Sequence, residues 1–252
     1  MTNPSGSLLG YTDSINQPTK IRLQDGSEMA ITDWSWRQLY STVDILSNAN
    51  DEQFVTWNYV ESDPVSHSSN IGQNQFRNAT KKDCNNDGKS QMPSEQEYIC
   101  YAVAIEVYQF TLDTNATGES AYTSAVPGTT IPNAGNLSLV QSKLIFALEI
   151  TQKDFYIGSP GWFSTGGGPF VTASGGLGGN LRTYANNGFA SKDAVDRSPV
   201  PLHIGGTEQF RGLFYNPDGN NVVWVDEAGQ PSSTTVIRLK TDMIGLHKRP
   251  AA

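Results

Sequence analysis

The sequence predicts an all-β fold, and three observations lead to this class. Residues 98–110 have the two-residue period of a strand with one apolar face. The chain contains 24 glycines and 13 prolines among its 252 residues, as expected where many short strands must be reversed. Charged residues make up only 17% of the chain, whereas disordered chains are usually rich in charge. We therefore expect a folded β domain.

The clearest strand is expected at residues 98–110. Its odd-numbered positions are apolar from Ile99 to Val107, and several even-numbered positions are small, including Ala102 and Ala104. Because side chains alternate between the two faces of a strand, we expect the odd face to lie on the core. The small residues indicate that a second surface packs closely against the other face.

Other segments of the chain also have strand character. Residues 34–46 fit either a helical stripe or one face of a strand, and both interpretations stay open. The remaining expected strands are residues 20–24, 28–32, 54–60, 143–150, 155–157, 200–204, 208–215, 221–225 and 235–244.

Turn and loop signals separate these strands. Asp25-Gly26 predicts a hairpin, and Gly205-Gly206 predicts another, between residues 200–204 and 208–215. Lys153-Asp154 predicts a turn before residues 155–157. Long loops are expected at residues 61–97, 111–136 and 158–190.

The number and spacing of the strands predict the architecture. About eight main strands must close into a sandwich or barrel, and loops of unequal length favour a jelly roll over an up-and-down barrel. We expect an N-terminal arm at residues 1–20, one eight-stranded jelly roll at 21–246 and a C-terminal tail at 247–252. A compact double jelly roll is the alternative, although about sixteen strands would be tight in this length.

Charge and cysteine content limit the partners. The net charge of −8 disfavours a grip on phosphates, so no sequence-specific nucleic-acid partner is expected. Two cysteines are too few for a disulfide framework; Cys100 is expected to be buried, and a bridge to Cys84 stays open. Residues 1–7 lack the features of a signal peptide, so we expect synthesis in a cytosol.

One segment resembles the opening of a calcium-binding loop. Asp83, Asn85 and Asp87 alternate and are followed by Gly88, as in a loop that wraps a hard cation with oxygen ligands. The twelfth position is Ser94 instead of the usual glutamate, and three lysines lie nearby. An exposed turn is the alternative interpretation. No other cofactor is expected.

The sequence contains no recognisable catalytic pattern. His67, His203 and His247 lie far apart, whereas a zinc site needs three or four clustered ligands. The nucleophile elbow of α/β-hydrolases does not occur. We therefore expect that the protein is not an enzyme.

A family resemblance enters at the C-terminal half. The segment SPVPLHIGGTEQFRGLF, residues 198–214, resembles the penultimate hairpin of viral jelly-roll capsid proteins. The ending LKTDMIGLHKRP, residues 239–250, resembles the closing strand and tail of capsid proteins from tailless icosahedral bacteriophages. Residues 79–98 are similar in pattern, and the resemblance covers about half of the chain.

The resemblance implies a structural virion protein. We expect a major capsid subunit that is made in the cytoplasm of a bacterial host and assembles with copies of itself and other virion proteins into an icosahedral shell. An internal membrane as a further partner stays open. Trp162, Tyr184 and Trp224 lie near loops and are candidate interface anchors, whereas Trp34 and Trp57 are expected in the core.

Two alternatives belong to other functional classes. A receptor-binding or carbohydrate-binding jelly-roll module, such as a virion spike, would use Trp162 and the loop around Asp83 as its site. A cupin-type enzyme would need a histidine-rich metal cluster, which the sequence does not contain.

Overall fold

The computed structural model describes most of the chain. The described residues are 9–13, 17–22, 28–30, 34–124, 131–164, 170–175, 181–186 and 201–248. Within them the chain forms mostly strands, which confirms the all-β prediction.

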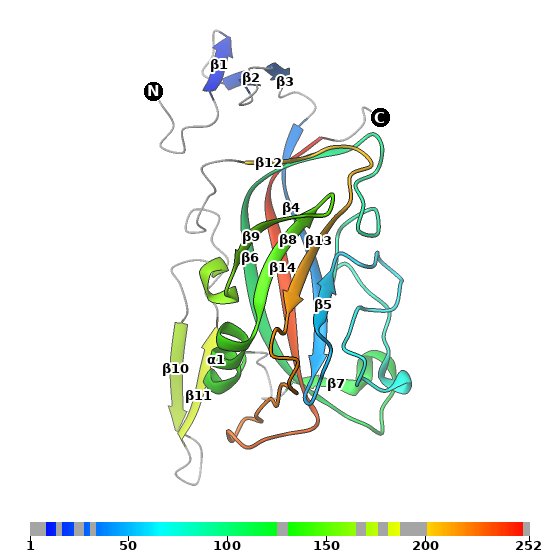
Figure 1. Cartoon of the computed structure of the whole chain (residues 1–252), viewed down its shortest axis with the longest axis vertical. Coiled ribbons are helices and arrows are strands. Elements are labelled where there is room, and N and C mark those ends of the chain that lie inside the picture. Colours follow the sequence, from blue (N-terminus) through cyan, green and yellow to red (C-terminus); the bar gives the residue numbers. More distant parts are fainter. Residues whose placement is uncertain are drawn as a thin grey trace.

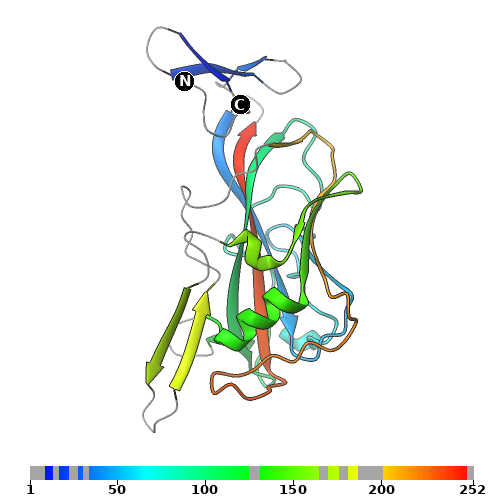
Figure 2. The same cartoon turned by 60° about the vertical axis from the view of Figure 1, so that its left-hand side comes forward.

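Two antiparallel sheets face each other as a sandwich (Figures 1 and 2). The first sheet has the order β12 (Leu202–Ile204), β6 (Glu97–Leu112), β14 (Thr235–Lys248) and β4 (Trp34–Leu46), with β7 (Tyr122–Ser124) pairing the distal end of β6. The second sheet has the order β5 (Gln53–Thr56), β13 (Phe210–Tyr215), β8 (Ile145–Ile150) and β9 (Lys153–Gly158).

The pairing of the sandwich strands is nested. Leaving out β7 and the two small sheets, the two four-strand paths give eight strands. The first of these along the chain, β4, pairs with the last, β14; β5 pairs with β13, β6 with β12, and β8 with β9. The eight strands therefore pair as the two arms of one long hairpin would. Successive pairs along this hairpin alternate between the first and the second sheet.

The core lies between the two sheets. Trp34 and Trp57 are buried, as the sequence predicts. The largest fully buried side chains include Trp57, Trp224, Tyr98, Phe146, Phe210 and Phe214. Apolar burial of this kind is the main favourable contribution to the stability of the sandwich.

A bulge in β6 reverses the alternation of its side chains between the two faces of the sheet. Ile244 pairs with Ala102 and Gly245 with Cys100, which leaves Tyr101 as the extra residue. Gly245 is required there, because a Cβ atom would lie 1.9 Å from the carbonyl oxygen of Ile99.

The bulge corrects the prediction for the first part of β6. Val103, Ile105 and Val107 belong to the main core as expected. Before the bulge, however, Tyr98 and Cys100 occupy the core instead of the odd-numbered positions. A strict two-residue period cannot anticipate an inserted residue.

Several elements lie outside the sheets of the sandwich, and the sequence interpretation missed them. The helix α1 (Ala134–Lys143) begins at Asn133, whose side chain accepts a hydrogen bond from the N–H of Gly135 at 2.8 Å. Beside α1 lies the hairpin of β10 (Phe170–Gly175) and β11 (Leu181–Asn186) (Figure 2). No helix in the described parts of the chain has the length and apolar character needed to cross a bilayer.

The N-terminal residues form a small sheet of their own. β1 (Leu9–Asp13), β2 (Gln17–Arg22) and β3 (Glu28–Ala30) pair antiparallel and lie beyond the end of the sandwich in both views (Figures 1 and 2). The pairing of β2 with β3 confirms that these two segments form a hairpin, whereas the predicted Asp25-Gly26 turn lies outside the described residues. The boundary expected after residue 20 falls inside β2.

The long polar loop predicted at residues 61–97 is confirmed up to residue 96, where β6 follows, and it covers one sheet edge. It contains the short helix η2 (Gln73–Gln75) and runs beside β4, forming bridges between Ser41 and Cys84 and between Asp44 and His67. Such cover keeps an edge strand from pairing with foreign chains. Cys84 and Cys100 are both buried and free, so no bridge joins them.

The predicted hairpin at Gly205-Gly206 is wrong. β12 pairs with β6 in the first sheet, whereas β13 pairs with β5 and β8 in the second. The Gly205-Gly206 turn therefore carries the chain from one sheet to the other. Local turn chemistry predicts a reversal but does not specify the strand that the returning segment will pair with.

Other boundaries also shift. Residues 34–46 form a strand, and residues 221–225 make only isolated bridges. The turn from β8 to β9 lies at Thr151 and Gln152, two residues earlier than predicted. The closing strand runs to Lys248 and buries His247, so the tail expected from residue 247 begins inside β14.

Candidate functional site

The structure places Asp83 in an ion pair. Its carboxylate accepts hydrogen bonds from Nη2 and Nη1 of Arg77 at 2.6 and 2.8 Å, and from the backbone N–H of Thr80 at 2.9 Å. Burial alone would raise the pKa of Asp83, but the bonds and charge of Arg77, with the charge of Arg238, outweigh burial and hold this pKa below its ordinary value. The carboxylate therefore already has a cationic partner.

The other two residues of the predicted calcium loop point to different partners. Asn85 accepts a hydrogen bond from the backbone N–H of Tyr40 at 2.8 Å and donates one to the carbonyl oxygen of Gln38 at 2.7 Å. Asp87 accepts from the side chain of Gln96 at 3.1 Å. The three side chains thus do not form a shared ligand set, and within the described residues no cluster of three His, Cys, Asp or Glu could hold a metal.

Instead, Asp83 belongs to a buried ion cluster on the outer face of the first sheet. Arg238 on β14 pairs with Asp44 on β4 at 2.6 and 3.0 Å. Arg77 lies 3.6 Å from Asp44, and Arg238 lies 3.5 Å from Asp83, so opposite charges alternate. The cluster of Arg77, Asp83, Asp44 and Arg238 attaches the long loop to the sheet.

Trp162, one of the three predicted interface residues, reaches the surface. It is 76% exposed and lies in the short helix η4 (Pro160–Phe163). The helix is held firmly, because the ring of Phe163 packs against Phe146 with centroids 5.1 Å apart. Ser159, at the start of the helix, donates a hydrogen bond to the carbonyl oxygen of Gln141 at 2.6 Å. The indole is therefore presented on a fixed support.

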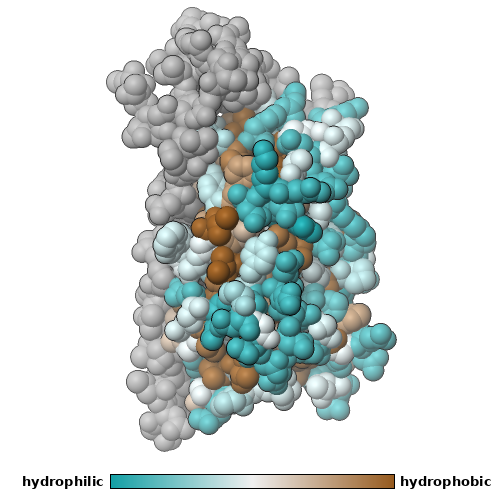
Figure 3. Space-filling view, viewed as in Figure 1, coloured by the Kyte–Doolittle hydropathy of each residue, from teal (hydrophilic) through white to brown (hydrophobic). Residues whose placement is uncertain are grey.

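Trp162 lies at the exposed edge of the second sheet. Its ring covers Gly158 of β9, where a Cβ atom would lie 3.1 Å from the indole. The preceding residue, Ile157, is 57% exposed. We call Ile157, Gly158 and Trp162 the β9–η4 patch. On the face seen in Figure 3, separate apolar groups lie among hydrophilic ones.

The other two predicted interface residues are Tyr184 and Trp224. Tyr184 lies in β11 opposite Thr172, and its side chain is outside the described residues. Trp224 is fully buried, and its Nε1–H donates to the carbonyl oxygen of Ile45 at 3.0 Å. The prediction of Trp224 as a surface anchor is wrong, because the segment around it folds over the core with its indole N–H satisfied.

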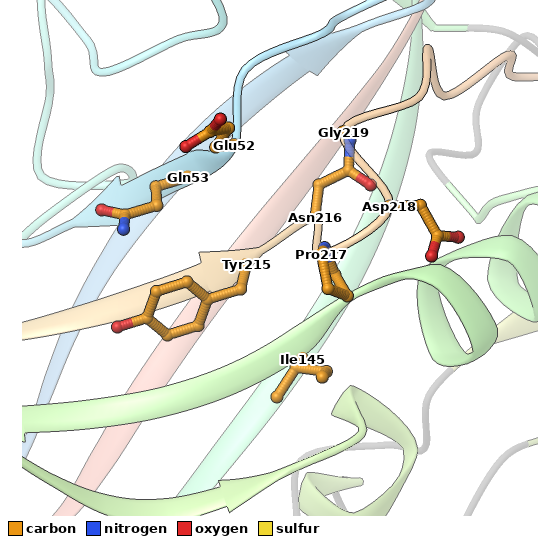
Figure 4. Close-up of a pocket in the computed structure, with 8 residues that line it drawn as sticks. All are labelled: Glu52, Gln53, Ile145, Tyr215, Asn216, Pro217, Asp218 and Gly219. Atoms are coloured by element: carbon orange, nitrogen blue, oxygen red, sulfur yellow. The ribbon is translucent and has the colours of Figure 1, made fainter.

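An open cavity of about 580 Å³ lies at the end of the second sheet (Figure 4). Glu52 and Gln53 line it beside Ile145 and Tyr215, together with the turn of residues 216–219. The ring of Tyr215 and the carboxylate of Asp218 point in different directions in Figure 4, and Asp218 pairs with Lys143 at 3.0 Å. The polar groups of this cavity do not converge on one point.

A second open cavity, of about 450 Å³, lies on the outer face of the first sheet. Four cationic side chains line it: Lys81, Lys82, Arg238 and Lys240. We call it the outer-face cavity. In the sequence the two lysines stand beside the calcium-like pattern, and only the register of β4, β6 and β14 brings the other cations to them.

No protein-family model matches this sequence, and a search of curated proteins found no match either.

Proposed function

We propose that the protein is a structural virion subunit, a major capsid protein that assembles with copies of itself into an icosahedral shell. The fold part of the proposal is a single jelly roll. It is supported by the nested pairing of eight strands, since a jelly roll is a double sheet of eight strands built from two Greek keys. Eight sandwich strands also favour a single roll over a double one.

The β9–η4 patch is the observation that favours a capsid subunit over the other functions of jelly rolls. Jelly rolls serve as capsid subunits, lectins and cupin enzymes, so the fold alone does not decide. In this chain an edge strand with the exposed Ile157 ends beside Trp162, which follows the anchored Ser159 and precedes the packed Phe163. Exposed edges invite pairing with another chain, and tryptophan is a favoured anchor of interfaces. A second copy of this protein is the proposed occupant.

The resemblance to phage capsid proteins supports the proposal in a modified form. The segment 198–214 supplies β12 and β13, the two strands that precede the closing strand β14. These two strands lie in opposite sheets and do not form a hairpin, which agrees with the order of a jelly roll. On this proposal the protein is made in a host cytoplasm and functions in the virion, with copies of itself and other virion proteins as partners.

Sedimentation velocity of the purified protein tests the assigned interface. Trp162→Glu places a charge in the patch, so we expect the large species of the wild type to be replaced by a monomer or small oligomer. Trp36→Glu is the matched control, because Trp36 is also an exposed tryptophan but lies on the first sheet. Equal assembly of Trp162→Glu and the wild type, or equal loss in both variants, would contradict this interface.

A further inference from the structure

We propose that the outer-face cavity binds a small anion carried on a ring, such as a nucleoside phosphate or an acidic sugar. The inference is separate from the capsid proposal and uses different residues. At about 450 Å³ the cavity falls within the usual size range of small-molecule sites.

The floor of the cavity presents cations whose positions are fixed. Arg238 is held by Asp44 in a two-point ion pair. The Nζ atom of Lys240 donates to Glu106 at 3.1 Å and lies 3.2 Å from Asp242. Asp44 and Asp242 are at most 1% exposed, whereas the side chains of Arg238 and Lys240 are 12% and 18% exposed. An incoming ligand therefore meets Arg238 and Lys240 before Asp44 and Asp242. The side chain of Glu106 is 11% exposed and is occupied by its hydrogen bond from Lys240.

The rim supplies positive charge that is not neutralised. Lys81 and Lys82 are exposed, and in the described part of the chain neither forms an ion pair. Their backbone is nevertheless fixed: the hydroxyl of Tyr40 donates to the carbonyl oxygen of Lys81, and the next residue, Asp83, is locked to Arg77. Two adjacent free ammonium groups in a chain of net charge −8 favour an anionic ligand.

Aromatic side chains also line the cavity and favour a ligand that contains a ring. Tyr40, Tyr108 and Phe110 line the cavity. The guanidinium of Arg238 lies 4.5 Å from the centre of the Phe110 ring, and Nζ of Lys240 lies 4.9 Å from that of Tyr40. These contacts hold the walls and the cations together. A ligand with both an anionic group and a ring would use both kinds of surface, whereas inorganic phosphate would use only the first.

Isothermal titration calorimetry on the full chain tests the proposal. The probes are adenosine monophosphate and N-acetylneuraminic acid, with inorganic phosphate and adenosine as controls. We expect saturable binding of at least one anionic ring compound, at least about tenfold tighter than either control and weakened by salt. The probe that binds tells whether the source is a nucleotide or an acidic glycan.

Matched variants locate the binding. Lys81→Ala with Lys82→Ala should weaken it at least about tenfold. The control double variant, Lys143→Ala with Lys153→Ala, removes the same charge away from the outer-face cavity and should leave the affinity for the probe unchanged. The proposal is overturned if neither anionic probe binds at about 10 mM, if both double variants bind alike, or if phosphate binds as tightly as the ring compounds, which would mark an adventitious ion only.

Discussion

The guanidinium of Arg77 donates two hydrogen bonds to the carboxylate of Asp83, at 2.6 and 2.8 Å, and both side chains are 1% exposed. The pair joins two parts of the long loop, and through Asp44 and Arg238 it reaches the outer face of the first sheet. The residue that the sequence suggested as a calcium ligand therefore anchors the loop that covers the edge of β4.

Removal of Arg77 should destabilise the protein strongly. Arg77→Met leaves the buried carboxylates of Asp83 and Asp44 short of positive charge, a defect that typically costs about 3–5 kcal/mol. Urea unfolding measures this loss. The control is Arg211→Met, which breaks a partly exposed pair with Glu149 and should cost no more than about 1 kcal/mol. Similar losses in the two variants would contradict the anchoring role of the cluster.

Asp242 should make stability depend on pH. Burial, with the nearby charge of Glu106, raises the pKa of Asp242 from 3.8 to about 7, while Lys240 opposes the rise. Since the folded state then holds the proton more tightly than the unfolded chain, the contribution of this carboxyl is full below about pH 4. It is lost as the pH rises through about 7.

Asp242→Asn isolates this effect. Asparagine cannot ionise, so the free energy of unfolding of the wild type, minus that of the variant, should fall between about pH 4 and 8. Chemical unfolding at four or five pH values gives the difference directly. A difference that is constant across this range would show that Asp242 keeps an ordinary pKa.

Gly245→Ala should disrupt the bulge between β14 and β6. The added methyl would lie 1.9 Å from the backbone oxygen of Ile99, which cannot move without breaking the sheet. We expect a loss of at least about 3 kcal/mol, or failure to fold. At Gly205 the nearest atom would be 3.6 Å away, so Gly205→Ala should cost far less in thermal unfolding. Equal melting temperatures of the two variants would refute the need for glycine at this bulge.

Two tryptophans should respond oppositely to truncation. Trp224→Ala empties part of the core and should cost about 3–5 kcal/mol. Trp162 is 76% exposed, so Trp162→Ala should change the stability of the isolated subunit by about 0.5 kcal/mol or less. Guanidinium unfolding of dissociated protein provides the comparison. A large loss for Trp162→Ala would mean that this residue supports the fold instead of an interface.

The sequence predicts the strands of this fold better than their partners. Periodicity locates β6, β8, β13 and β14, because a strand that lies on a core alternates locally. The pairing of β12 with β6, more than a hundred residues earlier along the chain, leaves no local signal. The helix α1 was missed since only a few of its residues are buried, so its apolar stripe is weak.

The surfaces for which we propose a function also differ in how far the sequence predicts them. The exposure of Trp162 could be predicted, because this aromatic residue lies between glycines in a polar segment. Trp224 lies in an equally turn-rich segment but is buried, and only the path of the chain over the core separates the two cases. The outer-face cavity combines Lys81, Phe110 and Lys240, which only the folded sheet brings together.

Electron microscopy of the purified, full-length protein tests the central proposal most directly. If the chain is a capsid subunit that associates through the β9–η4 patch, particles at high protein concentration should be closed shells or hexagonal arrays. A stable monomer or trimer that forms no larger assembly at high protein concentration would contradict the capsid proposal.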